Sequence, residues 1–218
     1  MSEDFEKKDN LVEDTSFDNS NDEVYEKGSL SKAGLFFLEL IKIGILACIT
    51  IFVIRYFLFK PFSVKGQSME PNFYESDYLI IDEITYRFRE PARGEVIVLD
   101  SPVSTDFYLK RIIALPGERV KIENGKVIIY NNDNPKGLIL SENYLNEMDT
   151  SGSISLTLGS DQYFVLGDNR GASFDSRRFG AISREAIVGK VWLRGWPFDR
   201  ISSFDLPQYN LTLNENKV

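Results

Sequence analysis

Histidine is absent from all 218 residues of the chain. Without an imidazole, the chain cannot carry a Ser-His-Asp or a Cys-His arrangement, and it lacks the usual zinc ligands. The single cysteine, Cys48, lies inside an apolar run, which excludes a disulfide framework and a thiolate metal cluster. If the chain is a hydrolase, its general base must be Lys, Asp, Glu or Tyr. We expect neither a metal nor a cofactor.

Basic residues are also outnumbered by acidic ones, 25 Lys and Arg against 33 Asp and Glu. The net charge is -8 and the sequence pI is near 4.8, which argues against nucleic acid as the main partner. Much of the acidic excess falls near the N-terminus, in a stretch rich in Asp, Glu, Asn, Ser and Lys. Residues 1–34 are therefore predicted to form a disordered acidic tail.

The remaining composition is that of a folded protein. Hydrophobic residues make up 43% of the chain and aromatic residues 13%. The length fits one domain with a real core and one membrane segment.

One long apolar run, residues 35–59, is predicted to be a transmembrane helix. It is longer than the roughly 20 residues that cross a bilayer. Glu39 and Lys42 interrupt its first half, but they share a helix face and can pair. A buried helix of a soluble domain is the alternative, which the uncharged stretch 43–54 disfavours. The run lies too far along the chain for a cleavable signal peptide, and the flanking charges do not settle its orientation.

After the apolar run, the pattern changes to short β-strands separated by turn signals. Asn124-Gly125, between two arms rich in Val and Ile, predicts a two-residue hairpin. Helical periodicity is negligible beyond residue 60 apart from a turn near Arg184, so residues 60–200 are predicted to be an all-β domain and residues 201–218 an irregular tail. The predicted strands cover residues 78–81, 95–99, 107–115, 120–130, 154–158, 163–166 and 187–193.

Three motifs carry the candidate chemistry. Ser68 lies in Gly-Gln-Ser-Met-Glu-Pro, where Gly66 and Pro71 are typical of a turn that presents a hydroxyl to a cleft. Lys110 lies in the apolar strand Tyr-Leu-Lys-Arg-Ile-Ile, and the third motif begins at Gly167 with Gly-Asp-Asn-Arg. A buried, neutral lysine can act as the base for a serine nucleophile, provided that burial lowers its pKa from about 10.4 toward 7–8. Taken alone, Ser68 could be a turn residue and Lys110 an exposed edge-strand lysine.

Together, these motifs resemble the conserved boxes of type I signal peptidases. They occur in that family's order, and Arg93-Gly94-Glu95-Val96-Ile97-Val98 resembles the remaining β-strand box. The resemblance extends from the membrane span to about Pro197. Because no large insertion separates the lysine box from the Gly-Asp-Asn-Arg box, the chain looks more like the cyanobacterial, plastid and Gram-positive branches than the enterobacterial one.

The resemblance implies a role for each matching residue. Ser68 is the expected nucleophile, Lys110 the general base and Ser173 the hydroxyl that orients the lysine amine. The Ser68 backbone N–H would hold the oxyanion, but Gly66 replaces a hydroxyl residue of the enterobacterial pattern, which leaves the second donor open. The expected structural support consists of two ion pairs, Asp168 with Arg111 and Asp175 with Arg177. The expected substrate-binding positions are Phe62, Val64, Gly66, Met69, Tyr108 and Leu109, although core packing competes closely for Val64 and Leu109.

The same resemblance implies substrate, partners and location. The expected activity is cleavage of N-terminal signal peptides after small residues, at sites of the Ala-x-Ala type, in an extended peptide bound by β-augmentation. Expected partners are signal-peptide-bearing precursors, the lipid bilayer and the protein-export translocon, without nucleic acid. The expected location is the plasma or thylakoid membrane, with a single span and the catalytic domain on the extracytoplasmic or lumenal side.

Two rival functions remain to be weighed. A self-cleaving repressor-type Ser/Lys protease needs a DNA-binding helix-turn-helix, and residues 1–60 offer none. The other rival is a catalytically inactive, membrane-tethered β domain that binds extended peptides. The presence of Ser68, Lys110 and Ser173 counts against it.

Overall fold

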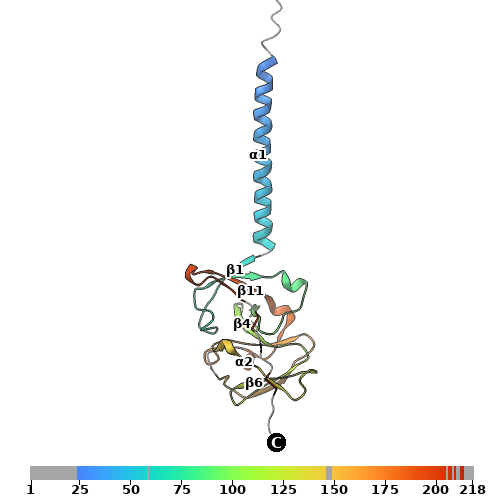
Figure 1. Cartoon of the computed structure of the whole chain (residues 1–218), viewed down its shortest axis with the longest axis vertical. Helices are drawn as coiled ribbons and strands as arrows, with labels where there is room; N and C mark the ends of the chain where they lie inside the picture. Colours follow the sequence, from blue (N-terminus) through green and yellow to red (C-terminus); the bar gives the residue numbers. More distant parts are fainter. Residues whose placement is uncertain are drawn as a thin grey trace, which may run out of the picture. The chain divides into compact units, whose positions relative to one another are not determined.

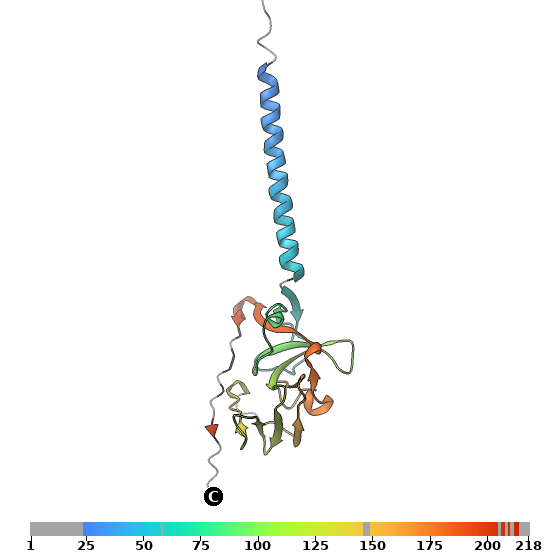
Figure 2. The ribbon, with the colours of Figure 1, turned by 90° about the vertical axis from the view of Figure 1, so that its right-hand side faces the viewer.

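The computed structural model describes residues 24–57, 59–145, 149–204, 206–207, 209 and 212–213. The chain divides into two compact units, Met1–Ile51 and Phe52–Val218, which are described separately below. Figures 1 and 2 show a long N-terminal helix and a β-rich domain in which strands from distant parts of the sequence lie side by side.

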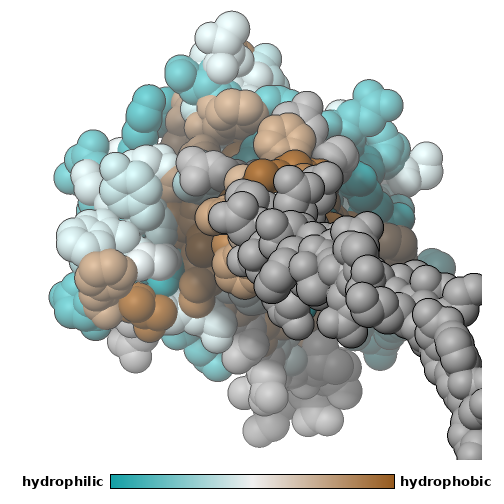
Figure 3. Space-filling model, turned by 90° about the horizontal axis from the view of Figure 1, so that it is seen from above, coloured by the Kyte–Doolittle hydropathy of each residue, from teal (hydrophilic) through white to brown (hydrophobic). Residues whose placement is uncertain are grey.

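The long helix, α1, spans Val24–Phe57. Its stretch Lys32–Val53 has a mean hydropathy of 2.3 and is 0% buried, so by length and composition it can cross a membrane. In the space-filling view of Figure 3, hydrophobic side chains reach the visible surface alongside hydrophilic ones. The helix begins at Val24, before the predicted residue 35, so residues 24–34 of the predicted acidic tail belong to it. The rest of the predicted acidic tail, residues 1–23, lies outside the described residues.

The β-rich domain is built on two antiparallel sheets (Figure 2). In the first sheet the strand order is β1-β2-β11-β3-β4-β9-β10, and β12 pairs with β11. Its strands are β1 Phe59–Ser63, β2 Tyr78–Asp82, β3 Val96–Asp100, β4 Phe107–Ala114, β9 Gln162–Leu166, β10 Ile182–Ser183, β11 Ile187–Trp196 and β12 Ser202–Ser203.

The second sheet has the strand order β13-β7-β6-β5-β8. Its strands are β5 Arg119–Glu123, β6 Lys126–Tyr130, β7 Leu138–Ile139, β8 Ile154–Thr157 and β13 Thr212–Leu213. The hairpin between β5 and β6 turns at Asn124 and Gly125, whose φ angles of 51° and 78° suit a two-residue turn. Short helices complete the domain: α2 Ser176–Phe179 and the 3-10 helices η1 Thr85–Arg87, η2 Asn143–Leu145, η3 Arg184–Ala186 and η4 Phe198–Arg200.

Alternation along the strands gives the first sheet two buried faces. One face contains Val96, Val98 and Leu109, which pack with the residues around Ser68 and with β2. The opposite face contains Ile97 and Ile112, which pack with β9 and β10. The second sheet contributes a third cluster of buried apolar residues. The predicted all-β domain is therefore confirmed.

Strand β4 is paired along only part of one of its two edges. On one side, β3 pairs with β4 from Phe107 to Arg111. On the other side, β9 pairs with β4 only from Arg111 onward, opposite Leu166. The edge formed by residues 107–110 is therefore free of a strand partner in the described part of the chain. An extended peptide could add to such an edge.

Candidate active site

Ser68 lies in the turn segment between β1 and β2. Gly66, with a φ of 76°, adopts a left-handed conformation that glycine tolerates readily. The loop after β9 holds this segment: the Asn169 N–H donates to the Ser68 carbonyl at 3.0 Å, and the Asn169 side-chain amide donates to the Gln67 carbonyl at 3.1 Å. The backbone on both sides of the Ser68 hydroxyl is thus fixed by one loop.

Lys110 reaches this hydroxyl from β4. Its Nζ donates to Ser68 Oγ at 2.8 Å and to the carbonyl of Leu109 at 2.9 Å. The residue is only 3% exposed. Burial lowers the pKa of Lys110 to about 8, although Asp175 and Asp168 act in the opposite direction by attracting the ammonium. Slightly above neutral pH, a minor but appreciable fraction of the Lys110 amine is therefore neutral, as a general base requires.

Ser173 lies near the same point but without the expected bond. Its Oγ is buried and has no hydrogen-bond partner among the described residues, so the predicted bond to the Lys110 amine is not formed here. Gly167 makes the close approach possible, because a Cβ at this position would lie 2.2 Å from Ser173 Oγ and 2.4 Å from the Ser68 carbonyl oxygen. The role of Ser173 in orienting the Lys110 amine remains a prediction.

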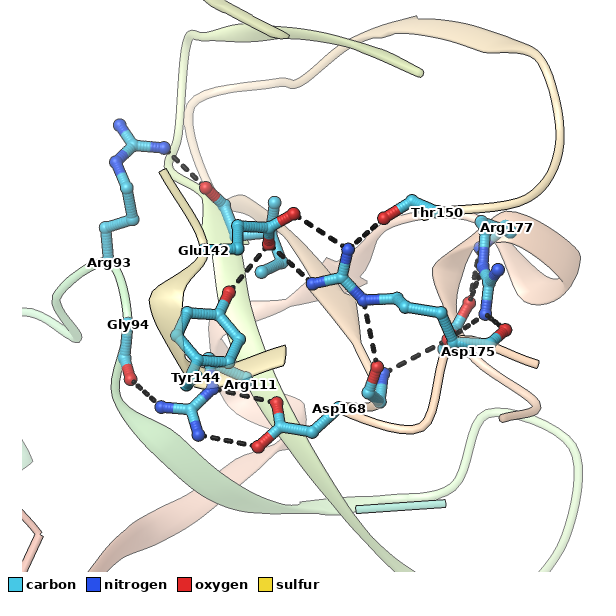
Figure 4. A network of polar contacts seen from close by, with 12 residues as sticks. Arg93, Gly94, Arg111, Glu142, Tyr144, Thr150, Asp168, Asp175 and Arg177 are labelled. Carbon is cyan, nitrogen blue, oxygen red and sulfur yellow. Dashed lines mark hydrogen bonds and ion pairs between the residues drawn. The ribbon is translucent and has the colours of Figure 1, made fainter. Parts of the chain in front are cut away.

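An ion pair braces the strand behind Lys110. Arg111 donates to both carboxylate oxygens of Asp168, at 2.8 and 2.6 Å, and to the Gly94 carbonyl at 2.9 Å (Figure 4). The amide of Asn72 donates to the same carboxylate at 2.9 Å. The ring of Tyr144 lies over the Arg111 guanidinium, 4.1 Å from its carbon to the ring centroid. The expected pairing of Asp168 with Arg111 is present, and it ties β4 to the loop after β9.

A second pair fixes the other end of that loop. Arg177 donates to both carboxylate oxygens of Asp175, at 2.9 and 2.8 Å, as expected (Figure 4). Asp175 also accepts from the Gly167 N–H at 3.1 Å. Burial alone would raise the pKa of Asp175, but the bonds from Arg177 and Gly167 outweigh it and leave that pKa lowered. The carboxylate therefore stays charged at neutral pH and anchors the loop that carries Gly167.

Several residues of this network were not predicted from the sequence. The Arg170 side chain is buried, donates to the Gly167 carbonyl at 3.1 Å, and bonds to Glu142 and Thr150. Glu142 also accepts from the Tyr144 hydroxyl at 2.7 Å. Arg170 belonged to a motif but had no assigned role, and Glu142 and Tyr144 fall in a region predicted to be loop-rich. The signal that leads to Glu142 and Tyr144 is the burial of the Arg170 side chain, because a buried charge needs partners, and the sequence does not reveal that burial.

A groove leads away from Ser68 and Lys110 along the free edge of β4. One hollow, of about 440 Å³, includes Phe62, Lys65 and residues 105–110 in its lining. A neighbouring hollow of about 310 Å³ shares Phe62, Lys65 and Phe107 and adds Ile81 and Val98. Of the predicted substrate-binding residues, Phe62, Tyr108 and Leu109 line the groove. Gly66 is exposed beside it, whereas Val64 and Met69 are 3% and 1% exposed and pack in the core.

Comparisons with known proteins give a consistent result. The family model described as "Signal peptidase, peptidase S26" matches residues 37–196. A probable signal peptidase I-2 from Synechocystis sp. is 36% identical over 75% of this chain and 75% of its own length. A signal peptidase I P from Bacillus subtilis subsp. natto is 32% identical over 82% of this chain and 98% of its own. The crystal structure of a signal peptidase I from Enterococcus faecalis, 31% identical, covers 47% of this chain and 97% of its own with a TM-score of 0.41.

Proposed function

The chain belongs to the signal peptidase family, peptidase S26, and is thus a serine peptidase; from this premise we propose that Ser68 and Lys110 form its catalytic dyad and cleave signal peptides after small residues. The observation that supports the dyad is the contact of 2.8 Å between Lys110 Nζ and Ser68 Oγ in a site that buries the amine. No other arrangement of base and hydroxyl with this geometry lies along the groove in the described part of the chain.

In the proposed reaction, the neutral Lys110 amine takes the proton of the Ser68 hydroxyl as Oγ attacks the carbonyl carbon of the residue before the cleaved bond. The Ser68 N–H, which donates to no described residue, is available to the oxyanion. The Lys110 ammonium then protonates the leaving amine, and the signal peptide remains as an ester on Ser68. Water hydrolyses this ester with Lys110 again acting as the base.

Substrate selection follows from the groove. An extended peptide along residues 107–110 would direct alternate side chains toward the face that carries Phe62 and Leu109. The two hollows, of about 440 and 310 Å³, are open to solvent and share Phe62, Ser63, Lys65 and Phe107, so they form one continuous groove, which suits small side chains at alternate positions. This supports recognition of Ala-x-Ala sites in signal-peptide-bearing precursors.

Helix α1 supplies the anchor. Its apolar stretch Lys32–Val53 suits a bilayer, and the nucleophile Ser68 follows within a short length of chain, so the dyad would act near the lipid surface. We place the catalytic domain on the extracytoplasmic or lumenal side of a plasma or thylakoid membrane, where the export translocon delivers its substrates.

A cleavage assay on a membrane-inserted precursor tests the dyad. Ser68→Ala and Lys110→Ala should each lower kcat by at least about 10³-fold, since nucleophile and base act as a unit. Two exposed residues of the second sheet region, changed as Ser153→Ala and Lys126→Ala, provide matched controls that should cleave normally. A substantial rate in either dyad variant would contradict the assignment. Peptide binding without cleavage by the unaltered protein would favour the inactive binding domain instead.

A further inference from the structure

The groove along β4 ends abruptly at Lys110. Strand β9 occupies the edge of β4 from Arg111 onward, so a bound peptide cannot continue along that edge. Under the proposed function, the signal-peptide side of the substrate would fill the groove from Phe107 to the dyad. The chain downstream of the cleaved bond must therefore turn away from the sheet beside Lys110, over the loop that follows β9.

An aromatic cluster lies beside Lys110. The Tyr108 ring centroid is 5.4 Å from Lys110 Nζ, and the Phe174 ring meets Tyr108 edge-on with centroids 6.4 Å apart. Phe179 of α2 packs against both rings. Phe174 nevertheless remains 40% exposed, although it follows the buried Ser173. Because Lys110 must protonate the leaving amine, the first residue after the cleaved bond has to pass close to this cluster.

An exposed arginine lies on the cluster. The Arg178 guanidinium carbon is 5.9 Å from the Phe174 ring centroid, and its side chain is exposed. Among the described residues it forms no ion pair, because the adjacent carboxylate of Asp175 is already occupied by both arms of Arg177. Asp168 is likewise engaged by Arg111. The positive charge at the exit is therefore available to a substrate.

We propose that Phe174 and Arg178 form a subsite for the first two residues downstream of the cleaved bond, with a preference for an acidic side chain there. The inference rests on the proposed function, since it takes Ser68 and Lys110 as the point of cleavage. An acidic side chain would pair with the guanidinium, while the aliphatic part of the same residue lies on the Phe174 ring. The mature N-terminus thus contributes to selection, on the other side of the bond from the small residues.

The test uses the full-length protein and two precursors that are identical up to the cleaved bond. One carries Glu at the first two downstream positions and the other carries Lys. The unaltered enzyme should cleave the Glu precursor with a kcat/KM about three- to fivefold higher, the scale of an exposed ion pair. Arg178→Glu should make the Lys precursor the better substrate, and Phe174→Ala should reduce the preference for the Glu precursor. The preference should also shrink at about 0.5 M salt, because the charges are exposed.

Arg119→Glu is the matched control. Arg119 is also an exposed arginine stacked on an aromatic ring, that of Tyr130, but it belongs to β5 in the second sheet. The Arg119→Glu variant should leave the preference for the Glu precursor unchanged. Equal cleavage of both precursors, or an equal change in both Arg→Glu variants, would overturn the subsite and leave the dyad intact. Failure of the unaltered enzyme to cleave either precursor would overturn the proposed function and the subsite with it.

Discussion

At the scale of single residues, Lys110 combines two properties that rarely occur together in a lysine. It is almost fully buried, yet its amine faces a serine hydroxyl instead of a carboxylate. A carboxylate in contact would keep the amine charged, and the nearest acids act from a distance while bonded to arginines. Arg111 and Arg177 therefore help Lys110 to serve as a base, because they hold the two nearest carboxylates, which would otherwise raise its pKa further.

Ser173→Ala should separate orientation from packing. If the Ser173 hydroxyl orients the Lys110 amine during turnover, this variant should lower kcat by about tenfold to a hundredfold, less than the dyad variants, because misplacement costs only part of the rate. Its thermal unfolding should change little, since Oγ forms no hydrogen bond of normal geometry with a described residue and Asp175 keeps its bonds from Arg177 and Gly167. A stably folded variant with full kcat would show that Ser173 is not involved.

The sequence pointed to candidate site residues and to two supporting ion pairs, but not to the second layer of contacts behind them. Ser68, Lys110 and Ser173 follow from residue type and motif order, and both predicted ion pairs are present. The second layer around Glu142 and Tyr144 did not follow, because its contacts join segments far apart in the chain. Val64 and Met69 occupy core positions, which local pattern could not distinguish from groove positions.

At the scale of elements, the loop after β9 joins the nucleophile segment to the base. Gly167 shows how closely: an added Cβ would collide with the Ser68 carbonyl, which is backbone and cannot rotate away. Gly167→Ala should therefore reduce cleavage at least about a hundredfold by displacing Ser68. Activity close to that of the unaltered enzyme would mean that the two segments can separate without harm.

Gly171→Ala is the control for this change in the same loop. The nearest atom to an added Cβ there is Asn169 Oδ1, at 3.9 Å, so the substitution meets no obstacle. It should cleave at nearly the normal rate. Equal loss in both variants would point to general loop flexibility instead of the contact at Gly167.

The elements themselves show what local pattern can and cannot predict. Strands β2, β3, β4, β8, β9 and β11 and the hairpin of β5 and β6 were predicted, because each carries several β-branched or alternating residues. The strands β7, β10, β12 and β13, each of two residues, were missed, since two residues show no periodicity. Strand β1 begins inside the predicted membrane segment, because its apolar residues continue the same run.

At the scale of the whole molecule, the two units have separate tasks. Deleting residues 1–51, the first unit, should leave cleavage of a short soluble peptide within about twofold, because the dyad and groove belong entirely to Phe52–Val218. Cleavage of a membrane-embedded precursor should fall much further, because the anchor raises the local concentration of the dyad at the bilayer. An equal loss on both substrates would mean that the helix supports the fold, and no loss on either would mean that anchoring is irrelevant.

The most direct measurement is the pH dependence of kcat/KM for the unaltered enzyme. Lys110 must be neutral to act, so activity should be low where the amine is protonated and should rise with pH through a limb near pH 8. The sign follows from the lowered pKa: a desolvated ammonium releases its proton before a free lysine does. A single limb near pH 8 would agree with Lys110 as the base for Ser68. A limb near the ordinary lysine value of about 10.4, or a rate independent of pH between about 6 and 10, would contradict it.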